Sequence, residues 1–349
     1  MTSPLPIDND YLINTLVDLL NIPSPTGFTQ TAIAHCERAM IDLELAPNRS
    51  VKGGVFAEWD GKSTDRPRAL TAHIDTLGAM VKEIKDTGRL VLTKIGGFAW
   101  NTVEGESCSI FTASGQVVRG TLLITKASTH IHAAEVNELK RSDENMEIRL
   151  DARTSSADET RTLGIEVGDF ISFDPRVEIS EHGFIRSRHL DDKAGVACIL
   201  AAVKAMKESG FQPAQRTTLH ISNYEEVGHG AAAGFPSDLV ELVVVDMAAV
   251  SRGQTSDEFH TTVCAKDSGG PYHIELTNHL RQLAEDTDIP YKMDIYPYYG
   301  SDGGAFWRAG GDVQVALIGP GVDASHNYER THIESLTATT QLIIEYLRS

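Results

Sequence analysis

The sequence contains only four cysteines, and no two of them form a CxxC pair. This scarcity argues against a disulfide framework and against a zinc site built from thiolates. No apolar run approaches the roughly 20 residues that a membrane-spanning helix needs. The first residues also lack the basic stretch and apolar core of a signal peptide. We therefore expect a cytoplasmic protein with no membrane partner.

Positive charge is also scarce. The 31 lysines and arginines are outnumbered by 49 aspartates and glutamates, which gives a formal net charge of -18. Such a surface repels phosphate backbones, so we expect no nucleic-acid partner. It favours cationic ligands such as free amino termini, although solubility alone also accounts for it. The 349 residues, with 41% hydrophobic and 23% charged side chains, are typical of one or two globular domains.

The two ends of the chain alternate helical and strand-like patterns. Apolar spacing predicts helices over residues 11–20 and 31–43, and apolar runs predict strands over 54–59 and 69–74. The alternation resumes after Asp191, with predicted helices over 194–208, 278–286 and 335–348 and predicted strands over 217–222, 242–245 and 313–318. Because continuously apolar strands between helices indicate a sheet covered on both faces, we expect an α/β fold with a mixed, largely parallel sheet flanked by helices.

The middle of the chain has a different pattern. Short strand-like runs occupy residues 90–92, 116–124, 146–150 and 169–173, and only 156–163 has a helical pattern. Short strands at this spacing predict a small β-barrel inserted into the α/β domain. We therefore divide the chain into a first α/β part, 1–77, an inserted β-rich domain, 78–175, and a second α/β part, 176–349.

Five groups of acidic or histidine side chains lie near the ends of predicted strands. In open α/β sheets, ligands bind beyond the carboxyl ends of the strands, where residues far apart in sequence converge. Each group alone has an ordinary interpretation as a surface pair, a helix cap, a strand end or an acidic turn. Only the set of five indicates a site.

The first group is His73 and Asp75. They are two residues apart, so in a strand they lie on the same face. A histidine that binds a metal usually donates its other ring N–H to a carboxylate, which fixes its tautomer. We expect the carboxylate of Asp75 to accept this N–H from His73.

The second group is Asp191 and Asp192, which precede the predicted helix 194–208. Capping that helix requires a single aspartate. The other can bridge two divalent cations with its two oxygens. Because neighbouring side chains point in different directions, we expect one bridging aspartate and assign this part to Asp191.

The third group is Glu225 and Glu226, after the predicted strand 217–222. In an extended segment their side chains diverge, so one can bind a metal while the other takes a proton from a nucleophilic water. The fourth is Asp246, at the end of the strand 242–245. The fifth is His326, after a glycine- and proline-containing loop.

The set supplies nitrogen and carboxylate ligands of the kind that zinc-like ions prefer. A bridging aspartate with two further ligands for each metal leaves positions open for water and substrate. Two such metals can polarise a carbonyl and lower the pKa of a bridging water. The predicted ligands are His73, Asp191, Glu226, Asp246 and His326.

The order of these motifs resembles a known family, the glutamyl, deblocking and tetrahedral (TET) aminopeptidases, which are dinuclear enzymes of the zinc exopeptidase group. The resemblance covers nearly the whole chain, including residues 79–84, 95–97 and 163–175 of the inserted domain. The motifs that carry it are HxD at 73–75, LDDKAG at 190–195, EEVG at 225–228, the apolar strand ending in Asp246, SDGGAF at 301–306 and the late His326.

The resemblance implies a role for each site residue. His73, Asp191 and Asp246 would hold one metal, and Asp191, Glu226 and His326 the other. Glu225 would be the general base that activates a metal-bridging water, with Asp75 behind His73. The resemblance also implies two divalent ions per subunit, zinc with cobalt or manganese as alternatives. It further implies a homo-oligomer, from a dimer formed through the inserted domain up to a dodecamer.

One motif departs from the family. The last motif commonly reads HSPVE, whereas residues 326–329 read HNYE and are followed by RTH. This ending resembles a subgroup associated in bacteria with synthesis of an N-acetylated dipeptide-amide osmoprotectant. The leading hypothesis is an aminopeptidase, either broad or selective for acidic residues, that acts on small peptides. The alternatives are a specialised amidase or deacylase acting on a small modified dipeptide, and a non-catalytic metal-binding scaffold. Paired carboxylates also occur in glycoside hydrolases, but five ligand groups fit metal chemistry better.

Overall fold

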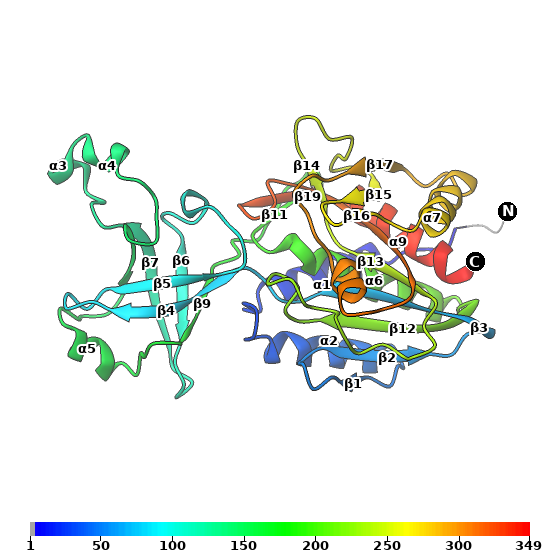
Figure 1. Ribbon diagram of the computed structural model, residues 1–349, viewed down its shortest axis with the longest axis horizontal. Coiled ribbons are helices and arrows are strands. Elements are labelled where there is room, and N and C mark those ends of the chain that lie inside the picture. Colours follow the sequence, from blue (N-terminus) through cyan, green and yellow to red (C-terminus); the bar gives the residue numbers. More distant parts are fainter. Residues whose placement is uncertain (1–3) are drawn as a thin grey trace. The chain divides into compact units, whose positions relative to one another are not determined.

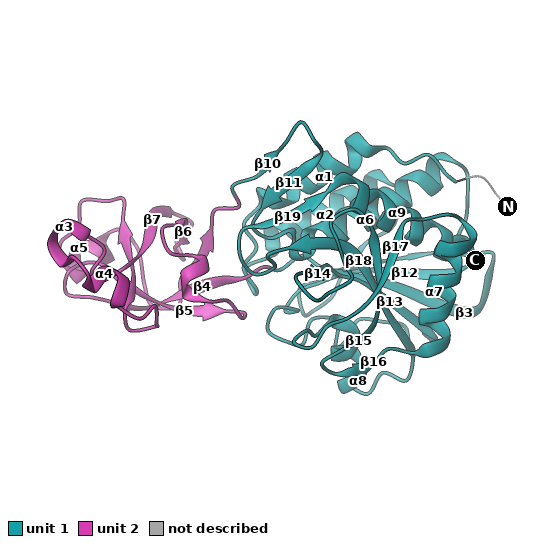
Figure 2. Ribbon diagram, turned by 90° about the horizontal axis from the view of Figure 1, so that it is seen from above, with its two compact units in different colours: residues 1–75, 176–349 teal, residues 76–175 magenta. Residues whose placement is uncertain are grey.

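The computed structural model describes residues 4–349 and divides them into two compact units. The larger unit consists of the chain up to Asp75 and of the segment from Arg176 to Ser349, and the smaller unit is Thr76–Pro175 (Figure 2). The fold is mixed α/β with an inserted barrel, as the sequence predicts.

The larger unit contains a 13-stranded sheet, whose main path runs in the order β1-β2-β12-β3-β13-β18-β19-β11-β10 (Figure 1). β14 and β15 pair with β18, and β16 and β17 pair with β15. The strands are β1 Asn48–Arg49, β2 Val55–Trp59, β3 Ser63–His73, β10 Glu178–Ile179, β11 Phe184–Ser187, β12 Gln215–Ser222, β13 Glu241–Val245, β14 Ala248–Val250, β15 Thr261–Asp267, β16 Gly270–Pro271, β17 Tyr291–Ile295, β18 Gln314–Asp323 and β19 Glu329–His332.

The centre of the sheet is parallel. β3 pairs in parallel with β12 and β13, and β13 pairs in parallel with β18. Ser222 lies opposite His73, and Val244 lies opposite Thr71. The carboxyl ends of β3, β12 and β13 therefore reach one edge of the sheet together, which is where α/β sheets bind ligands.

Helices and loops bury both faces of this sheet. Because successive side chains of a strand point to opposite faces, one strand contributes to two cores. On β13, Val243 and Val245 belong to the main core, which contains α1, α2, α6, α7 and α9. Leu242 and Val244 belong to a second core on the other face, against which Phe306 of α8 packs. The helices are α1 Asn9–Leu20, α2 Gln30–Asp42, α6 Leu190–Glu208, α7 Ile274–Asp286, α8 Asp302–Arg308 and α9 Ile333–Arg348.

The smaller unit is a closed barrel in the order β4-β5-β8-β7-β6-β9, and it has its own apolar core. The strands are β4 Gly78–Ile84, β5 Leu90–Ile95, β6 Ser107–Phe111, β7 Val117–Ile124, β8 Met146–Leu150 and β9 Phe170–Phe173. The helical segments are the 3₁₀ turn Trp100–Thr102, α3 Thr129–His132, α4 Glu135–Glu138 and α5 Ala157–Thr162.

The expectation of a single helix in this segment is wrong. α5 is present, but α3 and α4 are helices as well. Each is four residues long and buries no side chain, so neither has the apolar periodicity on which a helix prediction depends. Across residues 4–349, no helix is both long enough and apolar enough to span a bilayer.

Candidate metal centre

The predicted site residues come together at the carboxyl edge of the central strands. Asp191 is at the centre of the arrangement. One of its oxygens, Oδ1, lies 3.1 Å from Nε2 of His73, and the other, Oδ2, lies 3.3 Å from Nε2 of His326. The two oxygens of one buried carboxylate thus face two histidines that are far apart in sequence.

Each histidine has further carboxylates beside it. Nε2 of His73 lies 4.0 Å from Oδ1 of Asp246 and 3.8 Å from Oε2 of Glu225. Nε2 of His326 lies 3.7 Å from Oε2 of Glu226. Two neighbouring sets of nitrogen and oxygen atoms result, one around each histidine.

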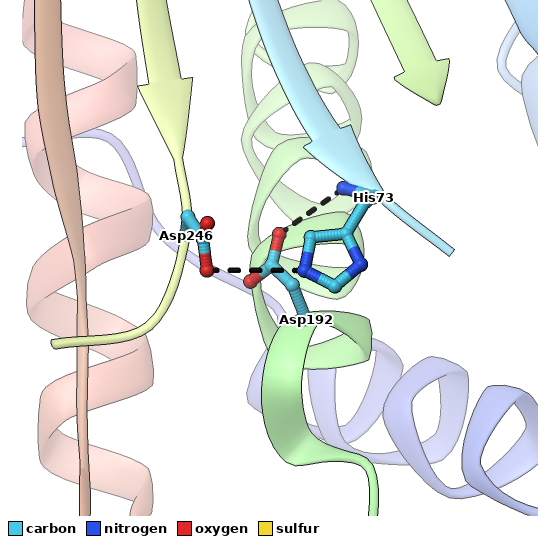
Figure 3. Close-up of side chains that lie close together, drawn as sticks. All are labelled: His73, Asp192 and Asp246. Carbon is cyan, nitrogen blue, oxygen red and sulfur yellow. Dashed lines mark hydrogen bonds and ion pairs between the residues drawn. The ribbon is translucent and has the colours of Figure 1, made fainter. Parts of the chain in front are cut away.

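Both sets have the spacing of a cation site. Donor atoms of Asp191, Glu226 and His326 all lie within 4.8 Å of one another. The same is true of His73, Asp192 and Asp246. Figure 3 shows the last three side chains converging from the end of β3, the start of α6 and the end of β13. Asp192 in the second set was not among the predicted ligands.

The two adjacent aspartates are bonded differently. Oδ1 of Asp192 accepts a hydrogen bond from the main-chain N–H of Gly195 at 3.1 Å, which is a capping contact at the start of α6. Its Oδ2 accepts the main-chain N–H of His73 at 3.3 Å. Asp192 therefore joins the helix to the end of β3, whereas the carboxylate of Asp191 faces both histidines. The bridging part assigned to Asp191 stays a prediction.

The contact between His73 and Asp75 differs from the expectation. Nδ1 of His73 lies 2.9 Å from the main-chain carbonyl oxygen of Asp75, and 3.7 Å from its carboxylate Oδ1. The carbonyl is thus the nearer partner that orients the ring. Metal-binding histidines use backbone carbonyls in this way as well as carboxylates. The ring is still held with Nε2 toward Asp191.

The carboxylate of Asp75 instead supports the two glutamates. It accepts the main-chain N–H groups of Glu225 at 3.2 Å and Glu226 at 3.3 Å, and the hydroxyl of Thr26 at 2.7 Å. The expectation of an extended segment at Glu225 and Glu226 is wrong, because both lie in a turn after β12. Tyr224 opens this turn with a φ of 79°, a left-handed conformation that is uncommon outside glycine.

Two further carboxylates hold the site, and they were not among the predicted site residues. Asp302, at the start of α8, accepts the hydroxyl of Ser222 and the main-chain N–H of Ala231, the latter at 2.7 Å. It thereby joins the two ends of the segment that carries Glu225 and Glu226. The SDGGAF motif was a signal for Asp302, although it did not indicate which groups the aspartate would bind.

Glu329 is the second of these carboxylates. Its Oε1 accepts the main-chain N–H of His326 at 3.0 Å, and its Oε2 accepts that of Asp191 at 3.2 Å. A single side chain thus fixes the backbone at both residues. The glutamate is retained in the altered last motif, which was the available signal in the sequence.

The site is crowded with buried acids. Burial, reinforced by the charge of Asp191, raises the pKa of Glu226 to about 8 and that of Asp246 to about 7. Burial also raises the pKa of Glu225 well above its usual value, and the charges of Asp246, Asp302 and Glu226 add to the effect. Divalent cations between these groups would favour their ionised forms. The donor set and its electrostatics therefore fit the binding of such ions.

His73 and Asp191 form an ion pair in this surrounding. Burial alone would lower the pKa of His73, but its hydrogen bond to Asp191 and the charges of Glu225 and Asp246 raise it well above the usual value. Burial opposes ionisation of Asp191, but hydrogen bonds from His326 and His73 lower its pKa below the usual range. Asp191 is thus the carboxylate of the site that remains charged most readily.

A cavity of about 580 Å³ opens beside these groups within the larger unit. Glu225, Asp246 and His326 are among its lining residues. A cavity of this size accommodates a small-molecule ligand. Of the altered segment 325–329, only Ser325 and His326 are lining residues. The substituted positions 327 and 328 therefore lie outside the lining of this cavity.

Sequence comparisons identify relatives of the whole chain. The profile of the M42 glutamyl aminopeptidase family matches residues 53–342. The protein YhfE of Bacillus subtilis (strain 168), provisionally named an aminopeptidase, is 49% identical over 332 residues, which is 95% of this chain and 96% of YhfE. A glutamyl aminopeptidase of Lactococcus lactis subsp. cremoris is 25% identical over 335 residues, covering 91% of this chain and 90% of the relative.

Solved structures share the fold. A TET aminopeptidase from a marine sediment archaeon, Thaumarchaeota archaeon SCGC AB-539-E09, superposes with a TM-score of 0.87 at 19% identity, over 97% of this chain and 96% of the other. The TET1 peptidase of Pyrococcus horikoshii, which can assemble into a tetrahedron or a large octahedral shell, superposes with a TM-score of 0.85 at 20% identity, over 97% and 99% of the two chains.

Proposed function

Because this chain belongs to the M42 glutamyl aminopeptidase family of peptidases, we propose that it removes N-terminal residues from small peptides with the aid of two divalent metal ions. The observation that carries this proposal is the position of Asp191. Its two oxygens face two histidines, and each histidine has a further carboxylate beside it.

The two ions would have separate ligands on either side of Asp191. His73, Asp191 and Asp246 would hold one, and Asp191, Glu226 and His326 would hold the other. Nitrogen and carboxylate donors suit zinc, and they also accept cobalt or manganese. When bound, two such ions polarise a carbonyl group and make a water molecule more acidic. Asp192 supports this site through its backbone contacts to His73 and Gly195.

Glu225 is the proposed general base. It lines the cavity, and its Oε2 lies 3.8 Å from Nε2 of His73. Its carboxylate would take a proton from the attacking water while the water oxygen forms a bond to the carbonyl carbon of the substrate. The carbon–nitrogen bond then breaks, and Glu225 would return the proton to the leaving amine nitrogen. The products are a carboxylic acid and an amine.

The reaction depends on Glu225 being ionised when water binds. Burial and neighbouring acids raise its pKa, which disfavours the carboxylate form in a site without cations. Positive charge close by favours the carboxylate. Asp75, which accepts the N–H of Glu225, keeps its backbone in place and is a positioning residue.

We further propose that the chain forms a homo-oligomer through the barrel unit. Assembly into large shells is described for the TET1 peptidase of P. horikoshii. The barrel has a complete apolar core of its own. Analytical ultracentrifugation of the intact chain tests this proposal, since a monomer at micromolar concentration would contradict it.

A substrate panel tests the aminopeptidase activity. The metal-loaded protein should hydrolyse alanyl-alanine amide and other unblocked peptides, and it should fail on the same compounds with an acetylated amino group. Equal or better turnover of the blocked compounds would favour the alternative of a specialised amidase or deacylase. No turnover of either class, in protein shown to contain two metal ions, would favour the scaffold.

A further inference from the structure

The cavity has side chains of opposite charge. Glu225 and Asp246 line it at the metal centre, and Arg252 and Arg308 are also among its lining residues. In a chain with a net charge of -18, arginines at the cavity are a local departure from the overall charge. A ligand that contacts both the metal centre and an arginine would need one group that binds at the metal centre and an anionic group that pairs with the arginine.

The strand pairing places Arg252 close to the loop that carries His326. β14 runs parallel to β18, and Val250 lies opposite Asp323. The chain leaves β14 through Ser251 to Arg252, and it leaves β18 through Ser325 to His326. Ser251 and Ser325 both line the cavity, so the two segments remain neighbours beyond their last paired residues.

The distance from the metal centre to Arg252 is limited by the chain between them. Arg252 follows Asp246 by six residues, which span at most about 20 Å when fully extended. That limit corresponds to the length of a short peptide. An amide bond held at the metal centre beside Asp246 and a group bound at Arg252 can therefore belong to the same small substrate.

The guanidinium of Arg252 is available for a ligand. Within residues 4–349, no carboxylate lies at ion-pairing distance from it, whereas Arg330 pairs with Glu258 and Arg216 with Asp238. Arg308 differs, because its Nη2 donates to the carbonyl of Gly228 at 3.2 Å and so supports the loop after Glu226. Arg252 is the better candidate for contact with a substrate.

We propose that Arg252 binds a carboxylate of the substrate and makes the enzyme selective for peptides that carry one within its reach. The inference rests on the proposed aminopeptidase function. A guanidinium binds a carboxylate through two parallel N–H···O bonds, which neither an amide nor an ester can reproduce. The carboxylate is either the C-terminus of a dipeptide or the acidic side chain of its first residue.

Two matched substrate pairs distinguish these sources. Alanyl-alanine and alanyl-alanine amide differ only in the C-terminal carboxylate, and glutamyl and glutaminyl p-nitroanilide differ only in the side-chain carboxylate. The metal-loaded enzyme should prefer the acid in one of the two pairs by about tenfold or more in kcat/KM, mainly through KM. The Arg252→Gln variant should lose that preference while its rate on the neutral partner is unchanged. The matched Arg308→Gln variant should keep the preference.

Binding measurements separate this proposal from the aminopeptidase assignment. Calorimetric titration of the metal-loaded Glu225→Gln variant with the same four compounds, with and without Arg252→Gln, does not depend on turnover. A carboxylate-dependent affinity that disappears with Arg252 supports the proposal even if no compound is hydrolysed. Equal affinity for both members of each pair, or an equal loss for acid and neutral compounds on substitution, would overturn it.

Discussion

The carboxylate of Asp75 accepts the main-chain N–H of Glu225 at 3.2 Å, so the residue that follows His73 by two positions holds the proposed base in place. It also accepts the N–H of Glu226 at 3.3 Å. The end of β3 and the turn after β12 are therefore joined by one buried side chain. Because Asp75 holds Glu225 in place, a substitution at Asp75 should impair proton transfer by Glu225, although Asp75 itself transfers no proton.

Asp75→Asn should lower kcat by about ten- to a hundredfold and change KM little, the usual scale for residues that orient a metal site. The amide keeps the size of the side chain, but its NH₂ group cannot accept one of the two N–H bonds. Thr26→Val, which removes only the hydroxyl bond to Asp75, is the milder control. Steady-state kinetics at fixed metal content measure both. A kcat within twofold of the wild type for Asp75→Asn would contradict the positioning role.

Glu329→Gln should weaken the metal at His326 more than the metal at His73. The glutamate accepts main-chain N–H groups from His326 and Asp191, and a glutamine would place an NH₂ group against one of them. We expect about a ten- to hundredfold loss of affinity at one site. Metal analysis after dialysis should then find close to one ion per chain in place of two. Glu334→Gln, at an exposed side chain on α9, is the control and should retain both ions.

Gly195→Ala should destabilise the protein, although alanine is the better helix former. A Cβ at Gly195 would lie 2.5 Å from Oδ1 of Asp192 and 2.6 Å from the carbonyl oxygen of Val245. It would displace the aspartate that joins α6 to β3. Gly304→Ala in α8 is a matched control, because its Cβ would meet only the end of the Arg308 side chain. Thermal denaturation should show a lower Tm for the first variant only. Equal Tm values would show that the backbone at Gly195 has room to move.

His220 should make the protein less stable as the pH falls below about 6.5. Burial, with a smaller effect of Lys52, lowers the pKa of His220 to about 4 in the folded state, against about 6.5 for an unfolded histidine. Between these values the unfolded state binds more protons, so the free energy of unfolding decreases with falling pH. The loss amounts to about 3 kcal/mol at pH 4.

His220→Asn removes this titration and leaves a polar group near Thr71, which lies 3.0 Å from Nδ1 of His220. The variant should be destabilised at pH 7, and its difference from the wild type should shrink by about 3 kcal/mol between pH 7 and pH 4. Urea unfolding at several pH values measures the difference. His182→Asn, at an exposed histidine, is the control. A difference that stays constant with pH would show that His220 does not titrate in this range.

The sequence was sufficient to predict the fold because the apolar pattern of each segment reflects which of its faces are buried. β13 is apolar at every position from Leu242 to Val245 because helices and loops cover both of its faces. The barrel was visible as a run of short strands. The helices α3 and α4 were not, because a single exposed turn leaves no apolar pattern.

The site was harder to predict in its hydrogen bonds than in its residues. The sequence indicated that one of the two adjacent aspartates caps the helix, and the structure gives this contact to Asp192, whose Oδ1 accepts the N–H of Gly195. The contacts of Asp75 and Asp302 could not be foreseen, because they depend on a turn that brings main-chain N–H groups to the carboxylates. Arg252 escaped notice for a related reason, since only the pairing of β14 with β18 places it at the cavity.

The central claim is that Glu225 acts as the base at a site with two metal ions. The direct measurement is the turnover of an unblocked peptide by Glu225→Gln, together with its metal content. Glutamine keeps the shape of the side chain but cannot take a proton from water. The account predicts two metal ions per chain and a rate lower by at least about a hundredfold. Wild-type turnover by this variant, or wild-type protein that binds no divalent ion and gains no activity from added zinc, cobalt or manganese, would contradict it.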